Sequence, residues 1–122
     1  GSGILNQHVA RRFMQPTRRA DLLARSRRIL TRNLEILTAW VKTQGDRVDF
    51  IPPRAGGMAF LRYRSAMPSV QFSERLRREQ GVFVAAGDWF GMEGYFRLGI
   101  GGDPAQLREG LRRLGEFLAD LP

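Results

Sequence analysis

The chain has 122 residues, 43% of them hydrophobic and 26% charged, which suits one globular domain with a modest core rather than a disordered segment. Cysteine is absent and His8 is the only histidine, which excludes a disulfide framework and a thiolate or histidine-rich metal site. The net charge of +8 is carried almost entirely by arginine, with Lys42 as the only lysine; it fits either solvated helix faces or a polyanionic partner.

The first part of the chain predicts helices. Residues 4–14 predict a short helix, and Pro16 predicts a bend because proline lacks an amide hydrogen and restricts the residue before it. Residues 18–44 predict one long helix that stops near Gly45. Apolar side chains recur there at three- and four-residue steps, namely at Leu23, Ile29, Leu30, Leu34, Leu37, Trp40 and Val41. At ~1.5 Å per residue this helix is about 40 Å long, which suggests a brace between two bodies; an ordinary long surface helix is the alternative.

A change to two-residue periodicity then predicts two strands, residues 47–51 and 58–64. The turn between them contains Gly56 and Gly57, which are free to take positive φ. Residues 69–80 predict an arginine-rich helix that ends at Gly81.

The last third predicts two more strands, residues 82–86 and 95–100, separated by a loop. The final helix begins after Asp103, a favourable cap, with Pro104 in the first helical position. Its apolar stripe consists of Leu107, Leu111, Leu114 and Leu118. We therefore predict an α+β fold, a small mixed or antiparallel sheet covered by helices, with a long N-terminal interdomain helix.

Arg97 is the residue that we single out. Alternation along residues 95–100, YFRLGI, predicts one apolar face made of Phe96, Leu98 and Ile100. Arg97 then points the other way, between Tyr95 and Gly99, on a rigid strand. A guanidinium there matches a carboxylate with two parallel hydrogen bonds. From the pattern alone, an ordinary exposed strand arginine is the simpler interpretation.

Four segments together resemble the C-terminal part of class I/II aminotransferases, the pyridoxal-phosphate (PLP) enzymes of fold type I. They are the end of the long helix (residues 33–37, NLEIL, with Trp40), the hairpin PRAGGMAF (residues 53–60), GVFVAAGDWFG (residues 81–91) and YFRLGI (residues 95–100). The last two are similar to the family patterns V-x-V-x-P-G-x-x-F-G and R-[LI]-[SG]. The resemblance runs over nearly the whole chain from about Ile4, and it departs from the family at Ala86, where the family often has proline.

The resemblance implies roles for particular residues. Arg97 matches the arginine that binds the α-carboxylate of the amino-acid substrate, and Gly56 and Gly57 match a hairpin near the active-site mouth. It also implies that residues 4–16 lead from a larger PLP-binding domain and that residues 17–122 form the C-terminal small domain. The complete enzyme would exchange an amino group between an amino acid and a 2-oxo acid, as a homodimer.

The cofactor lysine of this family belongs to the large domain. Lys42 lies near the end of the long helix, in no context similar to the cofactor-lysine motif, so we assign it no role. We therefore expect PLP in the parent protein, no cofactor in this chain alone, and no catalytic activity of the isolated chain.

Two alternatives remain open. GntR-type transcription regulators carry an aminotransferase-like effector domain behind a winged helix, and its C-terminal part would look much like this chain. An independent arginine-rich nucleic-acid-binding domain is the other, which we do not favour because no recognised module is visible. We expect a cytoplasmic protein without a membrane anchor, because cysteine is absent and no apolar run approaches the ~18 residues that a membrane helix needs.

Overall fold

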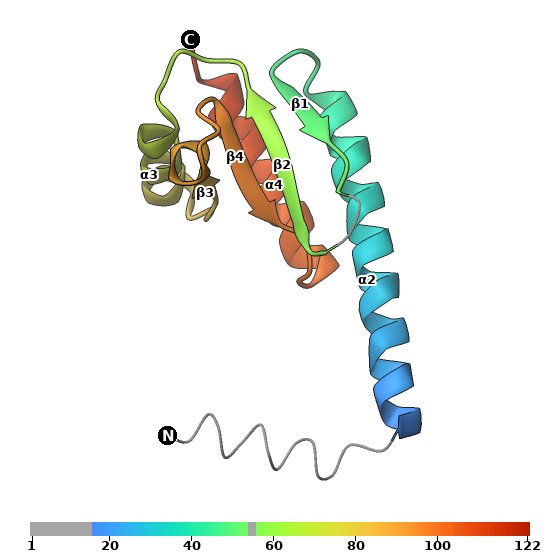
Figure 1. Cartoon of the computed structure of the whole chain (residues 1–122). Coiled ribbons are helices and arrows are strands. Elements are labelled where there is room, and N and C mark those ends of the chain that lie inside the picture. The colour runs from blue at the N-terminus through green and yellow to red at the C-terminus, as the bar shows by residue number, and fades with distance from the viewer. Residues whose placement is uncertain (1–15, 54–55) are drawn as a thin grey trace.

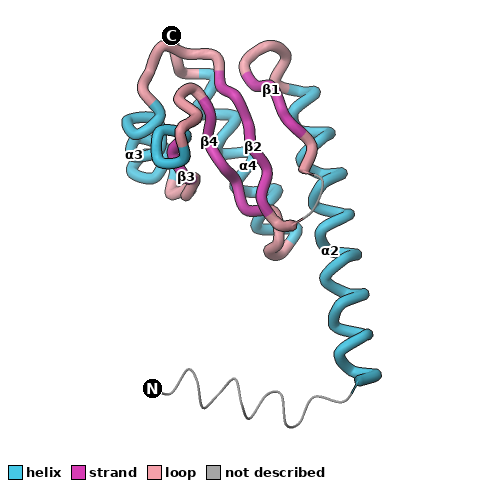
Figure 2. The backbone as a smooth tube through the Cα atoms, in the orientation of Figure 1, coloured by secondary structure: helices cyan, strands magenta, loops and turns pink. Residues whose placement is uncertain are grey.

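The computed structural model describes residues 16–53 and 56–122, so the helix predicted over residues 4–14 lies outside the described residues. The elements follow one another as α2 (Pro16–Thr43), β1 (Val48–Ile51), β2 (Met58–Tyr63), α3 (Ser69–Gln80), β3 (Ala85–Ala86), η1 (Gly87–Phe90), β4 (Tyr95–Gly99) and α4 (Pro104–Ala119). Figures 1 and 2 show them as one α+β body with α2 extending from it. The predicted fold class is confirmed.

Helix α2 has two unlike halves. It begins at Pro16 and runs for 28 residues, and Gly45, at φ 63°, follows its end. Residues 18–28 are all exposed, whereas Leu37 is completely buried and Leu30 and Leu34 pack against the core. In Figure 1 the N-terminal half stands clear of the sheet. In this chain, packing against the core therefore supports only the C-terminal half of α2. The N-terminal half has Leu22 and Leu23 on its surface.

The sheet has the order β1-β2-β4-β3, and every pairing in it is antiparallel. The predicted strand over residues 82–86 is wrong in extent, because only Ala85 and Ala86 pair with β4. The preceding residues are held by α3 instead, since the hydroxyl of Ser73 donates to the carbonyl of Val84 at 2.9 Å. The segment is also not uniformly buried, because the side chain of Phe83 is 76% exposed.

One face of the sheet is covered by helices and contains the core. The largest buried side chains there are aromatic: Phe72 of α3 stacks on Tyr63 and Phe96, with ring centroids 4.2 and 5.2 Å apart, and meets Phe117 of α4 edge to face. Burial of the Tyr63 hydroxyl, with the nearby charge of Glu93, raises the pKa of Tyr63 to about 12. This layer of α3, α4 and the end of α2 fixes the sheet from one side.

The second face of the sheet is open. Among the described residues no α-helix packs on it, and the short 3-10 helix η1 lies against it at the β4 side (Figure 1). Its side chains are those that alternate with the core residues: Asp49, Ile51, Met58, Phe60, Arg62, Tyr95 and Arg97. Within residues 16–53 and 56–122, no helix is both long enough and apolar enough to cross a membrane.

Candidate functional site

The strand that carries Arg97 alternates as predicted. Phe96 and Leu98 are buried on the helix-covered face, whereas Tyr95 and Arg97 are half-buried on the open face. Two neighbours hold β4 at this point, because Arg97 pairs with Phe60 of β2 on one side and with Ala85 of β3 on the other. Arg97 therefore lies in the interior of the sheet, where backbone bonds on both sides fix the position of its Cα.

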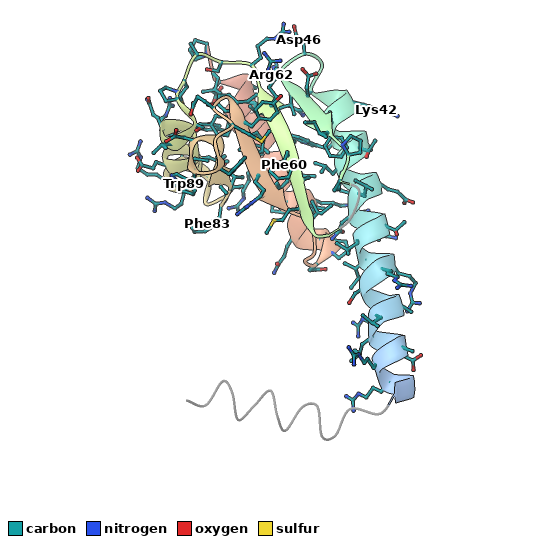
Figure 3. All side chains as sticks on the ribbon, in the orientation of Figure 1. Lys42, Asp46, Phe60, Arg62, Phe83 and Trp89 are labelled. Atoms are coloured by element: carbon teal, nitrogen blue, oxygen red, sulfur yellow. The ribbon has the colours of Figure 1, made fainter. Side chains whose placement is uncertain are left out.

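Two aromatic rings accompany the Arg97 side chain. Its guanidinium carbon lies over the ring of Phe90, 5.5 Å from the centroid, a favourable cation–π contact. The ring of Phe60 meets Phe90 edge to face at 5.5 Å, and Phe60 is directly opposite Arg97 across the strands. Figure 3 places Phe60 at the centre of the open face. The guanidinium therefore lies against an aromatic ring, and its side chain donates no hydrogen bond to another of the described residues.

Arg97 forms no ion pair with any carboxylate in the part of the chain that the structure describes. Three arginines on the helices do form ion pairs: Arg75 binds Glu79, Arg113 binds Glu109, and Arg112 bridges Glu109 and Glu116 at 2.6 Å each. Hydrogen bonds from Arg112 and Arg113 lower the pKa of Glu109 to about 2. The pairs are exposed and of the i,i+3 or i,i+4 kind, so they contribute little to stability. A fixed, half-buried guanidinium without a carboxylate is the feature that sets Arg97 apart.

The turn that presents Phe90 is tightly constructed. A Cβ atom on Gly87 would collide with the carbonyl oxygens of Met92 and Tyr95, so only glycine fits there. The carbonyl of Gly87 accepts from the amide of Met92 at 2.8 Å, and Gly91 closes η1 at φ 75°. Phe90 is thereby part of a tight turn, which gives its ring a defined position under the Arg97 guanidinium.

Asn33 anchors the far end of β4, and sequence reasoning missed it. It is completely buried on α2, and its side-chain nitrogen donates to the carbonyls of Ile100 and Gly102 at 2.7 Å each. The available signal was a polar residue on the apolar stripe, three residues after Leu30 and four before Leu37. These bonds tie the end of the Arg97 strand to the long helix.

Gly56 and Gly57 lie at the end of the sheet rather than beside Arg97. Gly56 adopts φ 86°, which explains the glycine, and lines a groove of about 300 Å³ between α2 and the hairpin. The carbonyl of Gly57 accepts from the amide of Ile100 at 2.7 Å. Gly57 precedes Phe60 by three residues, roughly 10 Å along the strand, so the structure brings neither glycine into contact with Arg97.

Lys42 is far from this face. It occupies the last turn of α2 and is exposed, and Figure 3 shows its side chain on the side of α2 turned away from the sheet. The described residues therefore do not fit a PLP site of their own, because the one amine available to bond the cofactor lies on the wrong side of the domain. The residues described also contain no cluster of three or more metal-ligating side chains.

Comparison with known proteins decides the family. The model of the aminotransferase class I and II family matches residues 2–114. This chain belongs to that family. A PLP-dependent aminotransferase from Streptococcus suis 89-1591 is 32% identical and superposes with a TM-score of 0.82 over 87% of this chain and 28% of its own. An aspartate aminotransferase from Thermotoga maritima is 27% identical, with a TM-score of 0.70 over 76% of this chain and 24% of its own.

An aromatic aminotransferase from Pyrococcus horikoshii OT3 is 26% identical, with a TM-score of 0.70 over 77% of this chain and 25% of its own. No curated protein matches this sequence significantly. The chain thus spans about a quarter of the length of the aminotransferases that it matches. Ala86 departs from the family pattern, yet its own φ of −67° is a value that proline could adopt.

Proposed function

We propose that this chain is the C-terminal, substrate-binding small domain of a PLP-dependent aminotransferase, and that Arg97 binds the α-carboxylate of the substrate. Membership of the aminotransferase family supports the reaction class. The observation that carries the residue assignment is the Arg97 guanidinium itself, which is fixed in mid-sheet, packed on Phe90 and without a carboxylate partner among the described residues. A carboxylate supplied by a ligand completes this arrangement.

The geometry explains how the domain binds and orients a substrate. The planar guanidinium donates two parallel hydrogen bonds to the two oxygens of a carboxylate, which fixes both the position and the rotation of the amino acid. The rings of Phe60 and Phe90 exclude water beside it, and charge-assisted hydrogen bonds are stronger where the local dielectric is low. Because Arg97 sits on a strand rather than on a loop, little ordering remains to be done when substrate binds.

The rest of the active site belongs to other parts of the parent protein. PLP, when bound there, supplies the electron sink that makes amino-group transfer possible, and the lysine that holds it comes from a large domain, since Lys42 is misplaced for that role. The exposed first half of α2 and the open sheet face are the surfaces that this domain offers to that partner. The substrates are an amino acid and a 2-oxo acid, the parent is a homodimer, and the isolated chain is inactive.

The test is made in the full-length protein. Arg97→Ala lowers kcat/KM for amino acids by about tenfold to a hundredfold, because a charge-assisted, paired contact is lost from a closed site. Arg97→Lys recovers only part of the loss, since it keeps the charge but not the fork. Arg64→Ala is the matched control, because Arg64 is an exposed strand-end arginine whose partner is Asp46; its kcat/KM stays at the wild-type value.

Substrates without a carboxylate provide the internal control. For amines that lack a carboxylate, kcat/KM of Arg97→Ala stays close to the wild-type value. Wild-type rates with amino acids in Arg97→Ala would overturn the carboxylate role. A full-length protein that binds amino acids through Arg97 yet transfers no amino group would instead support the aminotransferase-like regulator.

A further inference from the structure

Glu93 makes a set of contacts that the substrate site does not explain by itself. One carboxylate oxygen accepts from the backbone amide of Ser69 at 2.6 Å, and the other accepts from the Ser69 hydroxyl at 2.8 Å. The Ser69 hydroxyl oxygen in turn accepts from the backbone amide of Asp88 at 2.9 Å. Ser69 is completely buried. Glu93 and Ser69 are 24 residues apart, so three distant segments meet at this serine.

The contacts replace an ordinary helix cap. Pro68 occupies the N-cap position of α3 and makes no side-chain hydrogen bond, whereas serine, threonine, aspartate or asparagine normally fill that position. Glu93, 24 residues after Ser69 along the chain, supplies the missing acceptor. Its negative charge is favourable there, because the N-terminal end of a helix is positive. The two hydrogen bonds from Ser69 lower the pKa of Glu93. A cap alone, however, would not require the bond that the Asp88 amide donates to Ser69.

That additional bond leads to Arg97. Asp88 is the second residue of η1, the 3-10 turn that ends with Phe90, and Phe90 lies under the Arg97 guanidinium. Glu93 itself comes two residues before β4, the strand of Arg97. The Glu93–Ser69–Asp88 chain therefore fixes the turn on one side and the start of the strand on the other, at the two places that set the distance between ring and guanidinium.

We propose that Glu93 is a positioning residue for Arg97: acting through Ser69, it holds the turn of residues 87–90 so that Phe90 keeps the guanidinium oriented for a carboxylate. The orientation part stands on the contacts described above; its value for substrate binding rests on the proposed function of Arg97. Glu93 touches no substrate in this scheme. It acts only by fixing the ring on which Arg97 lies.

The first experiment reads Arg97 directly, without substrate. In the 122-residue chain, the NMR signals of the Arg97 side chain carry the ring-current shift of Phe90, and Phe90→Leu defines their position without the ring. In Glu93→Ala, the chemical shifts of these signals move at least half of the way from the wild-type values to those of Phe90→Leu. Glu93→Gln moves them less, because its amide oxygen still accepts from Ser69 while its nitrogen cannot accept from the hydroxyl. Glu79→Gln is the matched control, since Glu79 is an exposed glutamate near the end of α3 that accepts from Arg75 of the same helix; it leaves the Arg97 signals unchanged.

A pH series separates positioning from general stability. The folded-state pKa of Glu93 lies below its ordinary value, so its stabilising contribution is complete above about pH 4.5 and is lost as the pH falls through the lowered pKa. The Arg97 signals follow that titration in the wild type and not in Glu93→Gln. Two other titratable residues adjoin this cluster: Asp88, whose backbone amide donates to Ser69, and Tyr63, whose pKa the charge of Glu93 helps to raise. Both are retained in Glu93→Gln, and the pKa of Tyr63 lies far above the range.

The outcomes are distinct. Arg97 signals that stay at the wild-type position in Glu93→Ala while the melting temperature falls would show that Glu93 is only a helix cap, and would overturn the proposal. Should Glu93→Ala not fold, Ser69→Ala and Glu93→Gln carry the same test. In the full-length protein Glu93→Gln raises KM for amino acids by about tenfold and changes kcat less, because the guanidinium keeps its charge and loses its alignment. If Arg97→Ala leaves amino-acid kinetics unchanged while the Arg97 signals still depend on Glu93, the proposed function fails and the positioning role survives.

Discussion

The two faces of the sheet are built from the same strands and serve different purposes. Along β4, Phe96 and Leu98 are buried under α3 and α4, whereas Arg97, one position away from each, lies on the open face beside Phe60 and Phe90. The covered face is closed by stacked aromatic rings and holds the domain together. The open face keeps a charged group and exposed apolar side chains together on rigid backbone. A fold stabilised from one side can leave the other side free for chemistry.

The open face has an energetic cost that the covered face does not. Ile51 and Met58 are 52% and 48% exposed on adjacent strands, and Trp89 at the end of η1 is 64% exposed. Single exposed apolar residues are ordinary, but a group on one face marks a surface that another body covers. This agrees with a domain that spans about a quarter of the length of its relatives.

The largest expected effect contrasts one aromatic residue from each face. Phe72→Ala, on the covered face, lowers the free energy of unfolding by about 3–5 kcal/mol, because a completely buried ring leaves a cavity among Tyr63, Phe96 and Phe117. Phe60→Ala, on the open face, costs about 1–2 kcal/mol, since the ring is half-buried and loses mainly its edge-to-face pair with Phe90. Urea denaturation of the 122-residue chain measures both.

Equal decreases in the free energy of unfolding for Phe72→Ala and Phe60→Ala would show that the open face contributes as much to stability as the core does. A free energy of unfolding of Phe60→Ala that equals the wild-type value within error would show instead that its ring serves only the neighbouring Arg97. Either result would contradict the assignment of most of the stability to the covered face and a smaller part to the open face.

Most of the covered face was predictable from the sequence. The periodicities of three to four and of two residues predicted each described α-helix and strand to within a few residues, because the core buries most of the apolar side chains that define them. The 3-10 helix η1 was predicted only as a loop. The alternation of Phe96, Arg97 and Leu98 was predictable for the same reason. The strand predicted over residues 82–86 was too long, because Val82 and Val84 are apolar and β-branched and therefore resemble strand residues. Both are buried, but the carbonyl of Val84 accepts from Ser73 of α3 and β3 begins only at Ala85.

The surroundings of Arg97 were not predictable in the same way. Phe60 lies opposite Arg97 only because of the strand register, and no local pattern specifies that register. The bonds from Ser69 to Glu93 and Asp88 join residues 19 to 24 positions apart, and Asn33 meets Ile100 across 67 positions. Periodicity records which face a residue occupies; it does not record which distant residue faces it.

The next effect is on association. The isolated chain self-associates, because Leu22 and Leu23 on α2 and Ile51 and Met58 on the open face have no cover among the described residues. Replacing Ile51 and Met58 together by serine weakens association by about tenfold, the equivalent of ~1.4 kcal/mol of lost apolar contact. Light scattering over a dilution series measures the change, with Ala119→Ser of α4, an exposed small residue, as the control.

Replacing Leu22 and Leu23 by serine in parallel shows which surface dominates. A larger effect from this pair would place the main contact on α2 rather than on the open face. A wild-type chain that stays monomeric at every concentration would mean that neither surface requires a partner.

The smallest expected effect concerns Lys42, which lies on neither face of the sheet. After incubation of the 122-residue chain with PLP and reduction with borohydride, Lys42 is labelled only to the extent of an ordinary surface amine. The reason is geometric: the side chain leaves the last turn of α2 on the side away from Phe60, and the Arg97 face cannot hold a cofactor that is bonded there. An unrelated lysine-containing peptide treated with PLP and borohydride in the same way gives the reference reactivity, and mass spectrometry of the reduced adduct gives the extent of labelling. Stoichiometric, saturable labelling of Lys42 together with amino-group transfer would show that this chain holds its own cofactor, and would overturn the proposal that a large domain supplies it.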